Sequence, residues 1–126
     1  MPWKISYLEE LKIVKTVYTE PAKLEELLEA VVANLAFAKE KQTNLFLGDC
    51  TALTETGATM DIYQLGQFLE SLQADWTIKE AIIAPSARQN VIDDLHFFAT
   101  VPQNRMIRVR LFQDIQSATE WLMNEM

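Results

Sequence analysis

Polar residues that could support chemistry are predicted just beyond the ends of buried strands. Asp49-Cys50 follows one apolar run, Pro85-Ser86 follows a second and Gln113-Asp114 follows a third. In open α/β sheets, ligands bind beyond the carboxyl ends of the parallel strands, so these pairs are expected at one rim of the sheet. The pattern locates a functional surface there without naming a reaction.

These residues do not assemble into a catalytic constellation. His96 is the single histidine, and without partners it forms neither a catalytic triad nor a metal site. The glycines fit neither GxGxxG nor a Walker A loop. Cys50 has no lysine or histidine nearby in the sequence, so a small buried hydrophobe is its expected role. We therefore predict a non-enzymatic protein without metal or cofactor; the enzyme alternative rests on Asp49 and Cys50 alone.

Several of these polar residues also have structural interpretations. Ser86 with Gln89 forms a capping-box pattern for a helix, and Asp114 suits the cap of the last helix. Asp49 is suited equally to bonding a loop amide and to a site, so both roles stay open. An exposed position on a helix is expected for His96.

The aromatic residues of the second half are the better candidates for binding. Helix geometry places Phe98 on a buried stripe and Phe97 near the opposite side. With Val101, Phe97 would cap a groove, meet a partner or form a homodimer contact. The other candidates, three aromatic residues and Met60, either fill the core or line an apolar cavity between the second and third helices, and both interpretations stay open. The candidate ligand-binding residues are Met60, Tyr63, Phe68, Trp76, Phe97 and Phe98.

The strands that must position these residues are visible as alternating or continuous apolar runs. Alternation predicts a hairpin over 3–17, and β-branched residues support it. Short apolar runs predict buried strands at 45–47, 80–84 and 106–112. Arg108 and Arg110 are expected on the other face of the last strand.

Apolar residues spaced three and four apart predict four helices between and after these strands. They are expected from Pro21, over about 59–76, after Ser86 and after Asp114. The order is β-β-α-β-α-β-α-β-α, which predicts a single α/β domain over 1–126 with a mixed sheet. The stripe expected to be buried on the first helix is Leu24, Leu27, Leu28, Val31, Val32 and Leu35.

The composition narrows the classes of partner and compartment. The chain has 126 residues, a formal charge of −7 and 49% hydrophobic residues, as in a globular domain. A negative protein repels a phosphate backbone, so nucleic acid is not an expected partner. We expect no membrane span and no signal peptide. One cysteine excludes an intrachain disulfide, and a cytoplasmic location is the expectation.

Two motifs and the predicted topology resemble a STAS domain, the fold of the anti-sigma-factor antagonists. The motifs are Leu-Phe-Leu-Gly-Asp-Cys at 45–50 and Thr-Glu-Thr-Gly at 54–57, before the second helix. The C-terminal run from Arg108, followed by Ala118 and Trp121-Leu122, is more similar to the stand-alone bacterial SpoIIAA-like proteins. The resemblance spans essentially the whole chain.

The resemblance implies two different binding functions. In the phospho-regulated antagonists, this loop reads Asp-Ser-Ser/Thr-Gly and its first Ser is phosphorylated. Here Glu55 occupies the acceptor position, and its fixed charge would at most imitate a phosphate. The SpoIIAA-like resemblance implies instead a hydrophobic, lipid-like ligand between helices and sheet, which is our leading hypothesis. The alternative is a protein-interaction module whose partner-binding loop comprises Asp49, Thr54, Glu55, Thr56 and Gly57.

Overall fold

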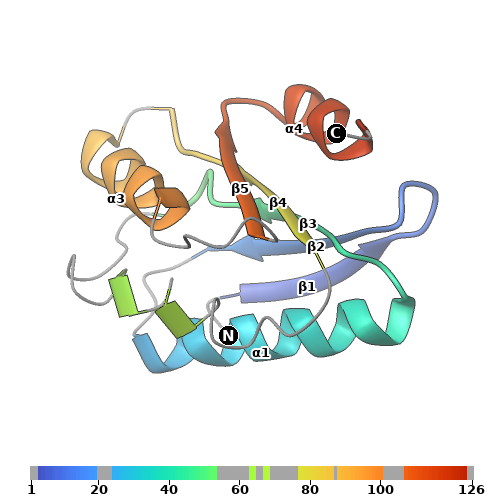
Figure 1. The fold of residues 1–126 in the computed structure, drawn as a ribbon. Helices are drawn as coiled ribbons and strands as arrows, with labels where there is room; N and C mark the ends of the chain where they lie inside the picture. Colours follow the sequence, from blue (N-terminus) through green and yellow to red (C-terminus); the bar gives the residue numbers. More distant parts are fainter. Residues whose placement is uncertain are drawn as a thin grey trace.

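Five strands form one mixed sheet in the order β1-β2-β3-β4-β5 (Figure 1). β1 pairs antiparallel with β2, and every later neighbour pairs in parallel. The computed structural model describes residues 3–19, 24–53, 63–64, 67–68, 77–86, 88–100 and 107–124. The strands are β1 (Trp3–Leu8), β2 (Ile13–Tyr18), β3 (Leu45–Asp49), β4 (Ile78–Ile83) and β5 (Ile107–Phe112).

Helices cover both faces of this sheet. α1 (Leu24–Lys41) and α3 (Gln89–Thr100) lie on one side, and α4 (Ile115–Met123) lies on the other (Figure 1). We call the two sides the α1/α3 face and the α4 face. The predicted α/β class and mixed sheet are confirmed. The helix expected over about 59–76 lies largely outside the described residues, although its described pairs 63–64 and 67–68 are helical.

Alternation along each strand divides the core into two clusters of side chains. On the α1/α3 face the cluster includes Val14, Phe46, Ile78, Ile82 and Ile107, with Val91, Leu95 and Phe98 from α3. On the α4 face it includes Ile13, Leu47, Ala81 and Ile83, with Ala118 and Leu122 from α4. The continuous apolar runs of β3 and β4 thus supply both clusters, as expected of strands buried on two sides.

α1 packs on the sheet through a narrower stripe than its leucine and valine spacing predicts. Val32 is 49% exposed, so its inclusion in the buried stripe is wrong. Ala30 and Ala38 are fully buried instead. A polar contact also joins α1 to the sheet: Asn34 Oδ1 accepts a hydrogen bond of 2.5 Å from the Thr16 hydroxyl on β2.

Candidate functional site

β4 carries two charged residues in succession, and they point to opposite faces of the sheet. Lys79 faces α4, whereas Glu80 faces α1 and α3, because side chains alternate along a strand. The two charges therefore cannot pair with each other. Each must find its partners within a different layer of the molecule.

Glu80 lies in the middle of an apolar patch on the α1/α3 face. Ile78 and Ile82 flank it along β4 and are only 2% and 3% exposed. Phe46 on β3 and Val109 on β5 are its neighbours across the ladder. The Glu80 side chain is itself only half-buried. Solvent therefore reaches Glu80, although the isoleucines on either side of it along β4 are buried.

The Glu80 carboxylate leans across β3 towards Gly48. A Cβ atom built at Gly48 would lie 3.6 Å from Glu80 Oε2 and 3.9 Å from Tyr18 Cε2. These are ordinary contact distances, so the missing side chain leaves room for a methyl group between the carboxylate and the Tyr18 ring. Gly48, Tyr18 and Glu80 thus form the floor of the candidate site, from three adjacent strands.

The electrostatics of this floor disfavour ionisation. Protein atoms surround the Glu80 carboxyl closely enough to raise its pKa to about 7 by desolvation. Burial also raises the pKa of Tyr18, and the neighbouring Glu80 and Cys50 raise it further. Burial, Glu80 and Asp49 raise the pKa of the Cys50 thiol in the same way. An additional negative charge at the floor of the site is therefore unfavourable.

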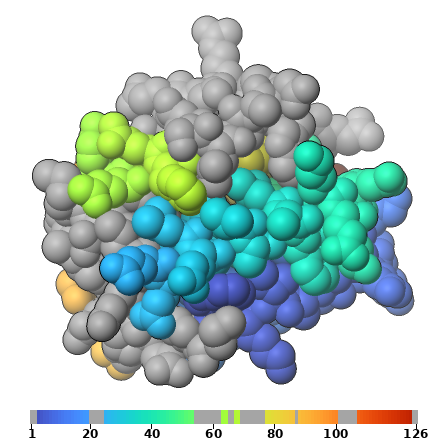
Figure 2. Space-filling view, turned by 90° about the horizontal axis from the view of Figure 1, so that it is seen from below, coloured from blue at the N-terminus to red at the C-terminus, as the bar shows by residue number. Residues whose placement is uncertain are grey.

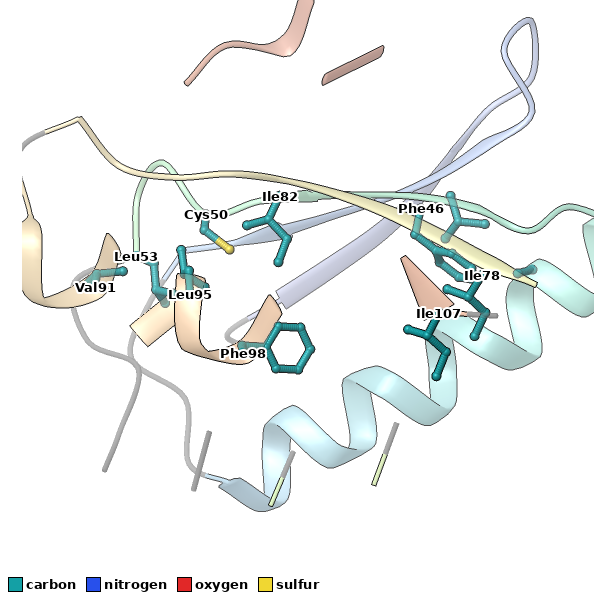
Figure 3. Close-up of a cluster of buried hydrophobic side chains, with 11 residues drawn as sticks. Phe46, Cys50, Leu53, Ile78, Ile82, Val91, Leu95, Phe98 and Ile107 are labelled. Carbon is teal, nitrogen blue, oxygen red and sulfur yellow. The ribbon is translucent and has the colours of Figure 1, made fainter. Parts of the chain in front are cut away.

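The apolar side chains around the floor form two groups at opposite ends of the strands (Figure 3). Cys50, Leu53, Val91 and Leu95 lie at one end, and Phe46, Ile78 and Ile107 lie at the other. Phe98 projects from α3 between the two groups. Because Glu80 stands between Ile78 and Ile82 on β4, its carboxylate also belongs to this middle stretch of the face.

An aromatic pair connects the 63–68 segment to α3. The rings of Tyr63 and Phe97 stack with centroids 6.4 Å apart, and the side chains are 40% and 36% exposed. Gln67 Nε2 donates a hydrogen bond of 2.9 Å to the Tyr63 hydroxyl. The same segment lies beside the first turns of α1 (Figure 2). The described residues 63–64 and 67–68 therefore lie beside α1, and Tyr63 contacts α3.

The structure thus joins some of the predicted ligand-binding residues and separates others. Phe98 is buried and Phe97 is exposed, which confirms their predicted orientations. Phe68 is half-buried in the same segment as Tyr63. Met60 and Trp76 lie outside the described residues.

The predicted partner-binding loop is described only at its first residue. Asp49 Oδ1 accepts hydrogen bonds from the Thr51 backbone N–H at 3.0 Å and the Thr51 hydroxyl at 2.7 Å. This is a local turn, one of the two roles that the sequence left open for Asp49. Thr54, Glu55, Thr56 and Gly57 lie outside the described residues.

The structural interpretations of the remaining candidates are partly confirmed. Asp114 caps α4, accepting from the Ser117 N–H at 2.7 Å, and these hydrogen bonds lower its pKa. His96 is exposed, as predicted. The capping box at Ser86 is wrong: α3 begins at Gln89, whose side chain donates forward to Asp93 at 2.8 Å instead of reaching back.

The α4 face shows how this protein accommodates a buried charge. The Lys79 ammonium donates hydrogen bonds to the carbonyls of Trp121 and Asn124 at 2.5 and 2.7 Å. It also lies 4.6 Å from the centroid of the Trp121 ring, with Arg108 at 5.7 Å from the same ring. Lys79 therefore binds the carboxyl end of α4. Burial, and then Arg108, lower its pKa.

Sequence reasoning missed Glu80 as a candidate because it took that residue as the first of its strand. The strand begins two residues earlier, at Ile78, so Glu80 lies inside it. The available signal was a carboxylate followed at once by four apolar residues, at a position where alternation demands an inward side chain. Within the described ranges, no group of three or more His, Cys, Asp or Glu residues could hold a metal ion.

Comparison with protein-family models and with curated proteins finds no match for this chain. The similarity to STAS domains therefore remains a prediction from the residues and motifs quoted above. Among the helices in the described part of the chain, none is long and apolar enough to cross a membrane.

Proposed function

We propose that this protein is a non-enzymatic, cytoplasmic STAS-like module that binds one small hydrophobic or amphipathic molecule against the α1/α3 face. The observation that carries this proposal is the half-buried Glu80 carboxyl, which has no hydrogen bond within the described residues, at the centre of an apolar patch. Ligand sites in proteins combine such predominantly apolar walls with very few placed polar groups.

Without a ligand, Glu80 would contribute unfavourably to folding. A partly buried carboxylate without a partner destabilises a fold, and proteins seldom keep one without a reason. Groups with strongly shifted pKa values concentrate at functional sites. The stacked pair Tyr63–Phe97 adds exposed aromatic surface at the edge of the same layer. The resemblance to SpoIIAA-like proteins implies the same class of ligand.

Binding of a neutral fluorescent probe tests the proposal. We expect N-phenyl-1-naphthylamine to bind the full chain at one molecule per protein, with enhanced and blue-shifted emission. Gly48→Val should weaken binding by about tenfold or more, because a branched side chain exceeds the methyl-sized room beside Glu80. Gly48→Ala is the matched variant, since its Cβ makes only ordinary contacts and should leave the fold intact.

Two results would count against a ligand-binding role. One is the absence of saturable probe binding, together with only the mass of the bare chain in native mass spectrometry. The other is binding that Gly48→Val leaves unchanged while circular dichroism shows that this variant is folded. The second result would mean that the probe does not bind at the floor formed by Gly48, Tyr18 and Glu80.

A further inference from the structure

The α1/α3 face carries one kind of charge at its strand positions, and that charge is negative. The strand residues on this face are apolar, hydroxyl-bearing or glycine, apart from Glu80. The lysines and arginines of the strands lie on the opposite face: Lys4, Lys15, Lys79, Arg108 and Arg110. No strand cation among the described residues is therefore available to neutralise the Glu80 carboxylate.

The groups closest to Glu80 do not neutralise its charge. Burial, and then Glu80, raise the pKa values of Tyr18 and Cys50, so both side chains are neutral. Neither supplies a cation, and no hydrogen bond links either side chain to Glu80 within the described residues. A partner that satisfies the carboxylate must therefore come from outside this group.

We propose that the ligand carries a protonated amine beside its apolar body, and that the amine binds Glu80 while the apolar body lies along the face towards Phe98. This inference rests on the proposed function and specifies its ligand class as a cationic amphiphile. Charge complementarity selects this class: an ammonium supplies both the missing positive charge and hydrogen-bond donors to a carboxylate. A fatty acid would place a second carboxylate beside the Glu80 carboxylate, which like-charge repulsion opposes.

The position of Glu80 also orders the two parts of such a ligand. Phe46 and Val109 are the ladder neighbours of Glu80 on β3 and β5, and Phe98 projects from α3 on the same face (Figure 3). An ammonium at Glu80 would thus be surrounded by apolar side chains that its alkyl chain can contact. Desolvation by those side chains strengthens the charge pair relative to one in water.

The test compares three molecules with the same alkyl chain and different head groups. Dodecylamine, dodecanol and dodecanoate are titrated into the full chain by isothermal calorimetry at pH 8, below their aggregation concentrations. We expect the amine to bind about tenfold more tightly than the alcohol, as one charge-assisted hydrogen-bonded pair predicts, and dodecanoate to bind most weakly. Glu80→Gln should remove the amine preference, so that dodecylamine then binds no more tightly than dodecanol.

The outcomes separate this inference from the proposed function. Binding of dodecanol at least as tight as that of dodecylamine, or an amine preference that survives Glu80→Gln, overturns the cationic ligand class while leaving a binding module intact. Failure of all three molecules to bind overturns both proposals. Glu80→Gln keeps the size and shape of the side chain, and circular dichroism checks that the variant is folded.

Discussion

Lys79 and Glu80 are adjacent on β4, yet the molecule treats their charges in opposite ways. The Lys79 ammonium has two carbonyl acceptors at the end of α4 and an aromatic ring below it. The Glu80 carboxyl has no hydrogen-bond partner within the described residues, although protein surrounds it closely enough to raise its pKa to about 7. Lys79 is buried and Glu80 is half-buried, so the main difference lies in their partners.

Lys79 is a charge with a structural role, whereas Glu80 has no such role in the described structure. Ammonium groups are favourable at the carboxyl end of a helix, where unpaired carbonyls gather. Lys79 therefore offsets its own desolvation by satisfying α4. Glu80 offsets nothing in the described structure, so a role outside folding explains it better. The following substitutions test each half of this contrast.

The largest effect is expected on the α4 face. Lys79→Met keeps the apolar stem but removes the ammonium. The Asn124 carbonyl then loses the Lys79 donor, and the Trp121 carbonyl keeps only the Asn124 N–H at 3.2 Å. We expect the free energy of unfolding at pH 7 to fall by about 2–3 kcal/mol, the range for hydrogen bonds to a charged group. Urea denaturation followed by circular dichroism measures it.

The matched control is Lys4→Met, at an exposed strand position on the same face. Its unfolding free energy should change by no more than about 0.5 kcal/mol, as for surface substitutions generally. If the two variants lose equal stability, Lys79 does not anchor α4, and the contrast with Glu80 disappears.

The second effect has the opposite sign and depends on pH. The pKa of Glu80 is raised from its ordinary value of 4.5 to about 7 in the folded protein. The folded state therefore binds more protons than the unfolded chain between these values, so stability falls as pH rises through this window. Glu80→Gln removes this loss, and we expect it to stabilise the protein by about 1–3 kcal/mol more at pH 8 than at pH 4.5.

Urea unfolding at both pH values measures this difference, with Glu9→Gln in the exposed β1–β2 turn as the control. The titratable groups facing Glu80 among the described residues are Tyr18 and Cys50, and their raised pKa values keep both neutral across the window. A Glu80→Gln variant that is less stable than the natural protein at pH 8 would show that the carboxylate has a structural partner.

Sequence pattern alone predicts the side of the sheet for each β4 residue but not the surroundings of that side chain. Alternation assigns Lys79 and Glu80 to opposite faces once the strand is known to include both. That Lys79 reaches carbonyls 42 and 45 residues further along the chain depends on how α4 docks. Local periodicity contains no information about such contacts, so neither the partner of Lys79 nor the isolation of Glu80 was predictable.

The same limit explains the error on α1. Periodicity correctly predicts a helix there, but Val32 is 49% exposed and Ala30 is fully buried. Asn34, on the same helix, accepts a hydrogen bond from Thr16 on β2, 18 residues earlier in the sequence. Hydrophobic spacing contains no information about such polar contacts with the sheet, nor about the burial of an alanine in place of a valine.

The smallest effect extends the comparison to α1, because among the described residues no distant side chain hydrogen-bonds to the end of this helix. The Gln42 N–H donates to the Lys39 carbonyl at 3.2 Å, and the Thr43 N–H donates to the Ala38 carbonyl at 3.0 Å. This backbone turn places Gln42 at φ 58°, the left-handed region that favours glycine. Where α4 depends on Lys79, α1 therefore depends on the conformation of a single residue.

Gln42→Gly should relieve that conformation and raise the free energy of unfolding by about 0.5–1 kcal/mol, measured by urea denaturation. Glu40→Gly, an exposed position inside the last turn of α1, is the control and should lower it by about 1 kcal/mol. Because the two variants introduce the same residue two positions apart, their opposite signs isolate the left-handed turn from general helix propensity. A loss of stability in both would mean that the Gln42 side chain supports the turn, and that α1, like α4, needs a side chain to end correctly.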